Sequence, residues 1–369
     1  MRRREPVPPP GSNGQVRFRC TFHNTIYDVF RARGWQETDS DVDWDVAWID
    51  TGWLRENFDT MHLAEHQRLN HFRNHYELTR KDNLIKNLKR TQRQLQREGK
   101  EEEARKYDFF PGTYVLPADY GLFVEEFKHH AGAIWIMKPI GKAQGKGIFL
   151  FNKLSQITDW KKDHRWKSDN PQAETYVVQR YVENPLLVGG KKFDLRIYVL
   201  VTSYSPLVVY LYRSGFARFS GSRYNVHAKN LGDTYVHLTN AAIQKTAPGY
   251  DAGAGCKWPL RNLKLYLIGK FGVAATDKLF VEIQELCIHT LLSVQKVRSP
   301  SPFYRVYAAS HSRPAPPCPT PPCPTTPAPP PHSTHHDPAL LILLQPTTTQ
   351  PSSSYSSPPR PSPPHPDPS

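Results

Sequence analysis

The stretch from Trp135 to Leu150, which reads W-I-M-K-P-I-G-K-A-Q-G-K-G-I-F-L, constrains the fold more than any other part of the sequence. Two apolar runs flank a loop of glycines and lysines, a pattern typical of a β-hairpin. Gly145 and Gly147 let their backbone N–H groups approach a phosphate because no Cβ intrudes, and the lysines offset its charge. The spacing is not that of the Walker loop, G-x-x-x-x-G-K-[ST]. The stretch alone fits a polyphosphate-binding loop or a basic surface hairpin.

The composition of the chain changes at Arg298. Of the 35 prolines in the 369 residues, 23 lie beyond it, where neither Lys nor Glu occurs. Such a segment cannot bury enough apolar surface to offset its chain entropy. We expect four segments: a disordered tail at 1–14, an N-terminal α/β lobe at 15–70, the main α/β region at 71–297, and a disordered Pro/Ser/Thr-rich tail at 298–369.

The net charge of +14 predicts an anionic partner. Nucleic acid, an acidic protein surface and a merely solvated basic face remain alternatives. No RRM, KH, zinc-finger or basic-zipper pattern occurs, so we expect no nucleic-acid partner. No run of about 18 apolar residues occurs, so we expect no membrane span. The five cysteines form no C-x-x-C pair, which argues against structural zinc and a secreted disulfide fold and favours the cytoplasm.

Alternating and helical patterns predict the elements of the first hundred residues. Val16 begins a strand, Thr25 to Gly34 form a short helix, and Trp44 to Asp50 form a second strand. Asp82 is expected to cap a helix that continues to about Tyr107. We interpret its charged surface as a solvated face.

Two further helices are predicted, at Tyr120 to His129 and at Thr276 to Val297. The second carries an apolar stripe that we interpret as core packing: Leu279, Phe280, Ile283, Leu286, Cys287, Leu291 and Val294. Cys287 on this stripe is expected to be a buried thiol without chemistry.

Polar side chains mark the strands that follow the opening hairpin. Tyr176 to Val182 reads as a strand, and a Gly189-Gly190 turn leads into a second strand that pairs with Leu207 to Tyr212. Three charged residues alternate at spacing two at the start of this second strand, so they share one face of it: Lys192, Asp194 and Arg196. They could form an exposed salt-bridge ladder, but a charged face beside a core hairpin favours a ligand-binding mouth.

Several motifs occur in order over nearly 200 residues, and together they resemble the tubulin tyrosine ligase-like family. They are K-P (138–139), Q-G-K-G (144–147), Q-R-Y-V-E-N-P (179–185), G-G-K-K-F-D-L-R (189–196), F-A-R-F-S (216–220) and V-H-L-T-N-A-A-I-Q-K (236–245), with H-F-R-N-H-Y-E-L-T-R-K-D (71–82) as added support. The resemblance implies an α/β fold of the ATP-grasp ligase type.

The resemblance also implies an activity, namely ATP-dependent ligation of glutamate to glutamate side chains of tubulin tails through an acyl phosphate. Tubulin and microtubules would be the partners, with further subunits an open question. The expected location is the cytoskeleton, with cilia or flagella and basal bodies. A tubulin glycine ligase and a non-catalytic nucleotide- or tubulin-binding isoform remain alternatives.

The site residues that the resemblance implies fall into three groups. ATP would be bound by Lys138, Gln144, Gly145, Gln179, Arg180, Tyr181, Val182, Lys192, Phe193, Asp194, Thr239 and Asn240. Arg196 would lie near the transferring phosphoryl group as the catalytic residue. Arg218 and Lys257, with Gln144, would bind the incoming amino acid. Two cations suit glutamate because it carries two carboxylates, and an arginine can grip one of them bidentately.

The sequence departs from the family in one respect. The family binds magnesium through acidic residues and an asparagine on two late strands, in a pattern like D-x-x-x-x-x-W-L-L-E-V-N, but here the last Glu is Glu285 and the Pro-rich tail takes the place of those strands. Mg²⁺ is expected from the family, yet we expect no metal ligands in this chain. Because the ion offsets phosphate charge, weak or no activity is predicted.

Overall fold

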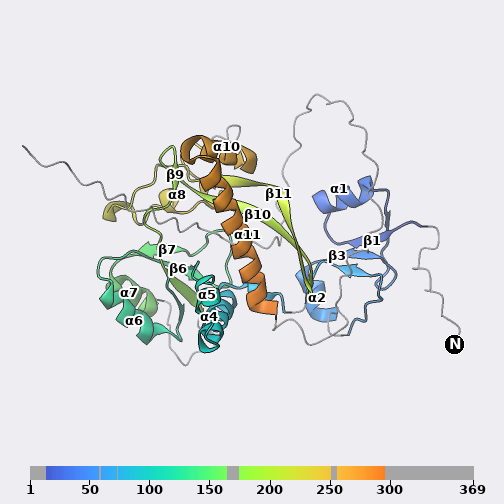
Figure 1. Cartoon of the computed structure of the whole chain (residues 1–369), viewed down its shortest axis with the longest axis horizontal. Helices are drawn as coiled ribbons and strands as arrows, with labels where there is room; N and C mark the ends of the chain where they lie inside the picture. Colours follow the sequence, from blue (N-terminus) through green and yellow to red (C-terminus); the bar gives the residue numbers. More distant parts are fainter. Residues whose placement is uncertain (1–13, 58–59, 73, 164–173, 251–255, 296–369) are drawn as a thin grey trace, which may run out of the picture.

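A computed structural model of the chain describes residues 14–57, 60–72, 74–163, 174–250 and 256–295 (Figure 1). Apart from Gly14, the predicted tails at 1–14 and 298–369 lie outside these ranges, as does the expected replacement of the late strands. The described residues form three four-stranded sheets with helices packed against them, so the predicted mixed α/β class is confirmed. None of the described helices is long and apolar enough to cross a membrane.

The first sheet belongs to the N-terminal segment and is parallel throughout, in the order β2-β1-β3-β4. Its strands are β1 (Arg17–Cys20), β2 (Gln36–Glu37), β3 (Val46–Trp48) and β4 (Arg68–Leu69), with helices α1 (Thr25–Ala32) and α2 (Thr51–Asn57). Asn24 caps α1 by accepting the Ile26 N–H, and Phe30 on α1 packs against Phe18 on β1. The predicted strands and helix of this segment are confirmed.

The predicted long helix after residue 81 is interrupted. The structure has α3 (Tyr76–Thr79), α4 (Lys81–Arg97) and α5 (Glu101–Arg105). Gly99, with φ +71°, takes the left-handed conformation that ends α4 and that glycine adopts without steric cost. The prediction that Asp82 caps the helix was wrong: α4 starts at Lys81 without a side-chain cap, and Asp82 is buried and paired with Arg80.

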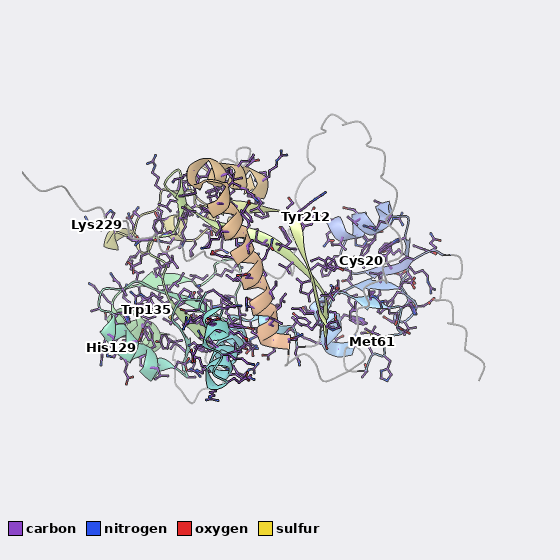
Figure 2. All side chains as sticks on the ribbon, in the orientation of Figure 1. Cys20, Met61, His129, Trp135, Tyr212 and Lys229 are labelled. Carbon is purple, nitrogen blue, oxygen red and sulfur yellow. The ribbon has the colours of Figure 1, made fainter. Side chains whose placement is uncertain are left out.

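The second sheet is antiparallel, in the order β5-β8-β6-β7, and contains the Gly/Lys hairpin. Its strands are β5 (Thr113–Leu116), β6 (Trp135–Pro139), β7 (Phe149–Phe151) and β8 (Tyr176–Arg180), with helices α6 (Tyr120–His129) and α7 (Leu154–Asp163). Phe123 of α6 and Ile157 of α7 join Trp135 in one buried cluster against the sheet. Figure 2 shows Trp135 within this densely filled part of the molecule. The predicted hairpin and the helix at Tyr120 to His129 are confirmed.

The third sheet is also antiparallel, in the order β12-β11-β10-β9, and its long hairpin runs towards α2 (Figure 1). Its strands are β9 (Leu187–Val188), β10 (Lys191–Tyr204), β11 (Leu207–Phe219) and β12 (Lys257–Pro259); η1 (Ala228–Asn230), α8 (Thr234–His237) and α9 (Ala241–Gln244) lie between β11 and β12. The predicted pairing of the two long strands is confirmed, and β11 extends to include the F-A-R-F segment.

Two helices that follow β12, α10 (Leu260–Phe271) and α11 (Val273–Gln295), pack against the third sheet. Four residues of the predicted stripe on the last helix are buried in the core clusters, and Leu279, Phe280 and Leu286 are partly buried and pack against one of them, so the prediction of core packing is confirmed. Cys287 is buried, and burial raises the pKa of its thiol to about 11. Helix α10 was not predicted.

We predict that Phe123→Ala lowers the free energy of unfolding by about 3–5 kcal/mol, because it empties a fully buried position among aromatic rings. Leu122→Ala on the same helix is the matched control, since Leu122 is 61% exposed and its loss should cost less than about 1 kcal/mol. Urea unfolding of both variants measures the difference. Equal losses would contradict the packing described for α6.

Candidate functional site

The third sheet has one polar face and one apolar face. Because side chains alternate along a strand, Lys192, Asp194 and Arg196 share a face of β10, while Phe193 and Leu195 lie on the other. The apolar face is buried against α10 and α11. Because the apolar face is covered, only the side chains of the polar face of this sheet can form a site.

Strand register places the charged residues of this face in one row. Asp194 on β10 lies opposite Arg218 on β11, and Arg218 lies opposite Lys257 on β12. Arg218 donates from Nε to Asp194 Oδ1 over 3.1 Å and from Nη2 to Oδ2 over 2.9 Å. Lys257 is exposed, with Nζ 5.1 Å from the ring centroid of Phe216.

Asp194 is also paired with Arg196, whose Nε lies 2.7 Å from Oδ2. This approach lacks the angle of a hydrogen bond, so the buried Nε and Nη2 of Arg196 have no hydrogen-bond partner among the described residues. Burial raises the pKa of Asp194 to about 6, although Arg196 and the Thr239 hydroxyl act in the opposite direction. The cluster therefore presents an unsatisfied guanidinium beside a carboxylate whose oxygens are both occupied.

The second sheet contributes Lys138 at the end of β6. Its Nζ donates to Gln179 Oε1 over 2.8 Å, and Gln179 Nε2 donates to the Thr113 hydroxyl over 2.9 Å. Burial, followed by the charge of Lys81, lowers the pKa of Lys138 to about 8. Gln179 thus uses its side chain to hold the lysine.

The Gly/Lys loop packs against the start of α9. Gln144 has φ +62° and Gly145 has φ +85°, so both are left-handed. A Cβ on Gly145 would lie 2.4 Å from Ile243 Cδ1 and 3.3 Å from Asn240 Cγ. Lys81 Nζ holds the loop from the other side by donating to the carbonyl oxygens of Pro139 and Lys142, each over 3.0 Å.

Lys192 lies where the two antiparallel sheets meet. Its Nζ donates to the Tyr181 hydroxyl over 2.8 Å and to the His237 carbonyl oxygen over 3.1 Å. Burial and the charge of Lys138 lower the pKa of Lys192 to about 7, and Asp194 opposes this. The Tyr224 hydroxyl donates to the Val182 carbonyl oxygen over 3.3 Å and to that of Glu183 over 2.7 Å.

Most of the residues predicted for the site therefore lie on or beside strands of the second and third sheets, and the others lie in the α8–α9 segment. Phe193 has its side chain in the apolar core, so only its main chain can meet a ligand. Arg218 is buried and already grips a carboxylate of the protein, and Lys257 stands at the exposed end of the row. Roles for ligand contact remain predictions.

Sequence reasoning missed four residues of this neighbourhood: Lys81, Thr113, Tyr224 and His237. Lys81 and His237 fall within motifs that were noted, at 71–82 and 236–245, without a role being assigned to them.

The described residues do not fit a magnesium ion. They contain no group of three or more His, Cys, Asp or Glu placed to hold a metal. Asp194, the carboxylate of the cluster, has both oxygens engaged by guanidinium groups.

A cluster of buried and half-buried cations beside a glycine loop is an arrangement typical of phosphate-binding sites. Comparison with protein families matches residues 59–311 to the Tubulin-tyrosine ligase family. The chain belongs to this family of ligases.

Similar proteins carry consistent names. The probable tubulin polyglutamylase TTLL9 of Bos taurus is 49% identical over 311 residues, which cover 76% of this chain and 67% of that protein. The probable tubulin polyglutamylase ttll-9 of Caenorhabditis elegans is 46% identical over 285 residues, covering 77% and 67%. The probable alpha-tubulin polyglutamylase Ttll1 of Tetrahymena thermophila is 43% identical over 301 residues, covering 77% and 72%.

We predict that Gly145→Ala weakens ATP binding about tenfold, because the left-handed backbone and the approach to Ile243 force the loop away from α9. Gly141→Ala is the matched control in the same loop, since a Cβ there meets nothing within 4 Å. Calorimetric titration with ATP measures both dissociation constants. Equal weakening by the two variants would show that the contact with α9 does not shape the loop.

Proposed function

We propose that the chain is a tubulin polyglutamylase of the ATP-grasp type, which binds ATP between its two antiparallel sheets and ligates glutamate to tubulin tails. The observation that carries the proposal is the charge of the buried cluster. Four cationic side chains accompany the carboxylate of Asp194: Lys192, Arg196 and Arg218, which are buried, and Lys138, which is half-buried. Buried charge is costly unless it is paired, and a triphosphate would supply the missing anions.

The proposed ATP contacts follow the assignment made from the motifs. Lys138 would meet the α-phosphate region, with Gln144 and Gly145 closing over the nucleotide. The main chain of 179–182 would read the adenine edge, and Lys192 and Asp194 would lie by the base and ribose. Thr239 and Asn240 would complete the phosphate end. The close approach of Gly145 to Asn240 supports this, because it brings two of these groups together.

The proposed chemistry has two steps. A carboxylate oxygen of a tubulin glutamate attacks the γ-phosphorus of ATP, the bond from that phosphorus to the bridging oxygen breaks, and ADP leaves. The amino nitrogen of the incoming glutamate then attacks the acyl carbon, phosphate leaves, and the nitrogen loses its proton. Catalysis rests on positioning and on cations that offset the moving charge. Arg196 suits the phosphoryl group because its guanidinium is buried and partly unsatisfied.

The proposed amino-acid site is formed by Arg218 and Lys257. They are direct neighbours on β11 and β12, so two cations face the same side of the sheet. Glutamate has two carboxylates, whereas glycine has one, and this favours glutamylation over glycylation. In this arrangement Arg218 would share its guanidinium between Asp194 and the substrate.

Tubulin as the acceptor rests on the names of the relatives and on the charge of the chain. A net charge of +14 would steer the protein towards glutamate-rich tails. The proposal also assigns the protein to the cytoskeleton, and to cilia or flagella and basal bodies, as the family resemblance implies. It includes weak turnover by this 369-residue chain, because its sequence lacks the expected magnesium-binding pattern, and absence of turnover is the second candidate below.

A second candidate is a nucleotide- or tubulin-binding protein without catalysis. The observation that favours it is the pairing of both Asp194 oxygens with guanidinium groups, which leaves this carboxylate no free oxygen for a metal ion.

We predict that the purified chain binds ATP and, with magnesium and tubulin, incorporates labelled glutamate in preference to glycine, at a low rate.

Arg196→Gln should weaken ATP binding about tenfold or more, because a charge-assisted contact to phosphate is lost. Arg213→Gln, an exposed arginine on β11, is the matched control and should bind as the parent does.

The assay separates the candidates. ATP binding without any incorporation supports the non-catalytic protein. Preference for glycine would identify a glycine ligase. Absence of ATP binding would overturn the polyglutamylase and the nucleotide-binding protein, and would leave only a tubulin-binding protein.

We predict that ATP binding takes up protons at a pH of about 8. In the free protein the pKa values of Lys192 and Lys138 are about 7 and about 8, so part of the population is neutral at that pH. The negative charge of bound ATP favours the ammonium forms, directly at Lys138 by the α-phosphate region and at longer range at Lys192 by the base and ribose. Both pKa values rise, so affinity falls as the pH rises above about 7.

Calorimetry in two buffers with different ionisation enthalpies measures this uptake. Lys192→Met should reduce it, while Lys128→Met, at an exposed position on α6, should not. Proton release on binding would contradict the prediction.

A further inference from the structure

His237 is a fully buried side chain that the proposed function leaves without a role. Its Nε2 lies 3.0 Å from the Asn230 carbonyl oxygen, which can only accept, so Nε2 carries the hydrogen. Nδ1 is then an acceptor and lies 3.1 Å from the Tyr181 hydroxyl, which donates to it. Burial lowers the pKa of His237, in keeping with a neutral ring.

This hydrogen bond determines what the Tyr181 hydroxyl can do. The Tyr224 hydroxyl oxygen is a second acceptor beside the Tyr181 hydroxyl, and His237 Nδ1 competes with it for the single hydrogen of Tyr181. With that hydrogen directed to His237, the Tyr181 oxygen accepts from Lys192 Nζ over 2.8 Å. Lys192 also donates to the main-chain carbonyl of His237, and its Nζ lies 4.4 Å from the centroid of the Tyr181 ring. The lysine is thus held by a side chain that His237 orients and by the backbone of His237 itself.

The three residues come from three parts of the fold. Tyr181 directly follows β8 of the second sheet, Lys192 lies on β10 of the third sheet, and His237 ends α8, two residues before Thr239. Two of the three N–H groups of the ammonium are used by these contacts, which leaves one for a ligand.

We propose that His237 is a positioning residue of the nucleotide site, which acts through Tyr181 to hold the Lys192 ammonium where it meets bound ATP. The proposal rests on the proposed function, since it deepens the description of the same site. An unheld lysine has many rotamers, and fixing it before the nucleotide arrives lowers the entropy cost of binding. Loss of the imidazole acceptor would free the Tyr181 hydroxyl to turn its hydrogen towards the Tyr224 hydroxyl or towards Lys192, which changes how its oxygen meets the ammonium.

Substitutions that imitate one ring nitrogen at a time test the proposal. The Oδ1 of asparagine can stand near the position of Nδ1, so His237→Asn keeps an acceptor for Tyr181. The Nε2 of glutamine can stand near the ring Nε2, so His237→Gln keeps the donor to Asn230 and loses that acceptor. Tyr181→Phe removes only the hydroxyl between them.

The measurement is calorimetric titration of the full chain with ATP, beside thermal unfolding followed by circular dichroism. We expect about tenfold weaker binding for His237→Gln and for Tyr181→Phe, and binding within about threefold of the parent for His237→Asn. Because His237 acts through Tyr181, the double variant Tyr181→Phe/His237→Gln should bind no more weakly than Tyr181→Phe alone.

The outcomes are distinct. Equal ATP affinities for the asparagine and glutamine variants, with equal losses in unfolding temperature, would show a structural role only and overturn the proposal. If the parent chain binds no ATP, the proposed function fails and this inference fails with it. If His237→Gln does not fold, Tyr181→Phe decides, and unchanged affinity in that variant overturns the proposal.

Discussion

The geometry of the site depends on the burial of Asp194 between Arg196 and Arg218. Both guanidinium groups lie on the polar face of the third sheet and are buried. Without the carboxylate, each would be an uncompensated buried charge. Removing one partner of such a group costs about 3–5 kcal/mol, which exceeds the net value of most single contacts. The pKa of Asp194 is nevertheless raised, to about 6, because desolvation outweighs the opposing effects of Arg196 and the Thr239 hydroxyl. The position of the carboxylate is fixed by its contacts with Arg196 and Arg218, although burial disfavours its charged form.

That geometry follows from the two faces of the third sheet. Apolar residues on one face pack against α10 and α11, and a slip of one residue would move them into the site and the charged residues into the core. Core packing therefore fixes the register of β10 and β11, and this register positions Asp194, Arg196 and Arg218. Beyond Ile197 the pairing of β10 and β11 is shifted by bulges, and there the polar face gives way to exposed apolar side chains such as Tyr198 and Leu200.

Sequence reasoning succeeded where the information was local. Alternation along 191–204 predicted a strand with Lys192, Asp194 and Arg196 on one face, and the stripe of α11 predicted its buried side. It failed where contacts join distant segments. Lys81 reaches Pro139 across 58 positions, and Tyr181 reaches His237 across 56, and no spacing rule connects them. The pairing of Arg218 with Asp194 was missed for the same reason: a motif can indicate that an arginine binds a carboxylate without indicating which one.

The excess of positive charge links the resting state of the site to its proposed use. In the free protein, burial lowers the pKa of Lys138 to about 8 with help from the charge of Lys81, and that of Lys192 to about 7 with help from the charge of Lys138. The two lysines therefore lose part of their charge by giving up protons near neutral pH. An arriving polyanion reverses this, because each phosphate charge makes the ammonium form favourable again. The same side chains can therefore be tolerated in the interior while the site is empty and become strong ligands once phosphate is present. Arg196, which cannot lose its proton, carries the remaining unsatisfied charge and is the group for which a bound phosphate matters most.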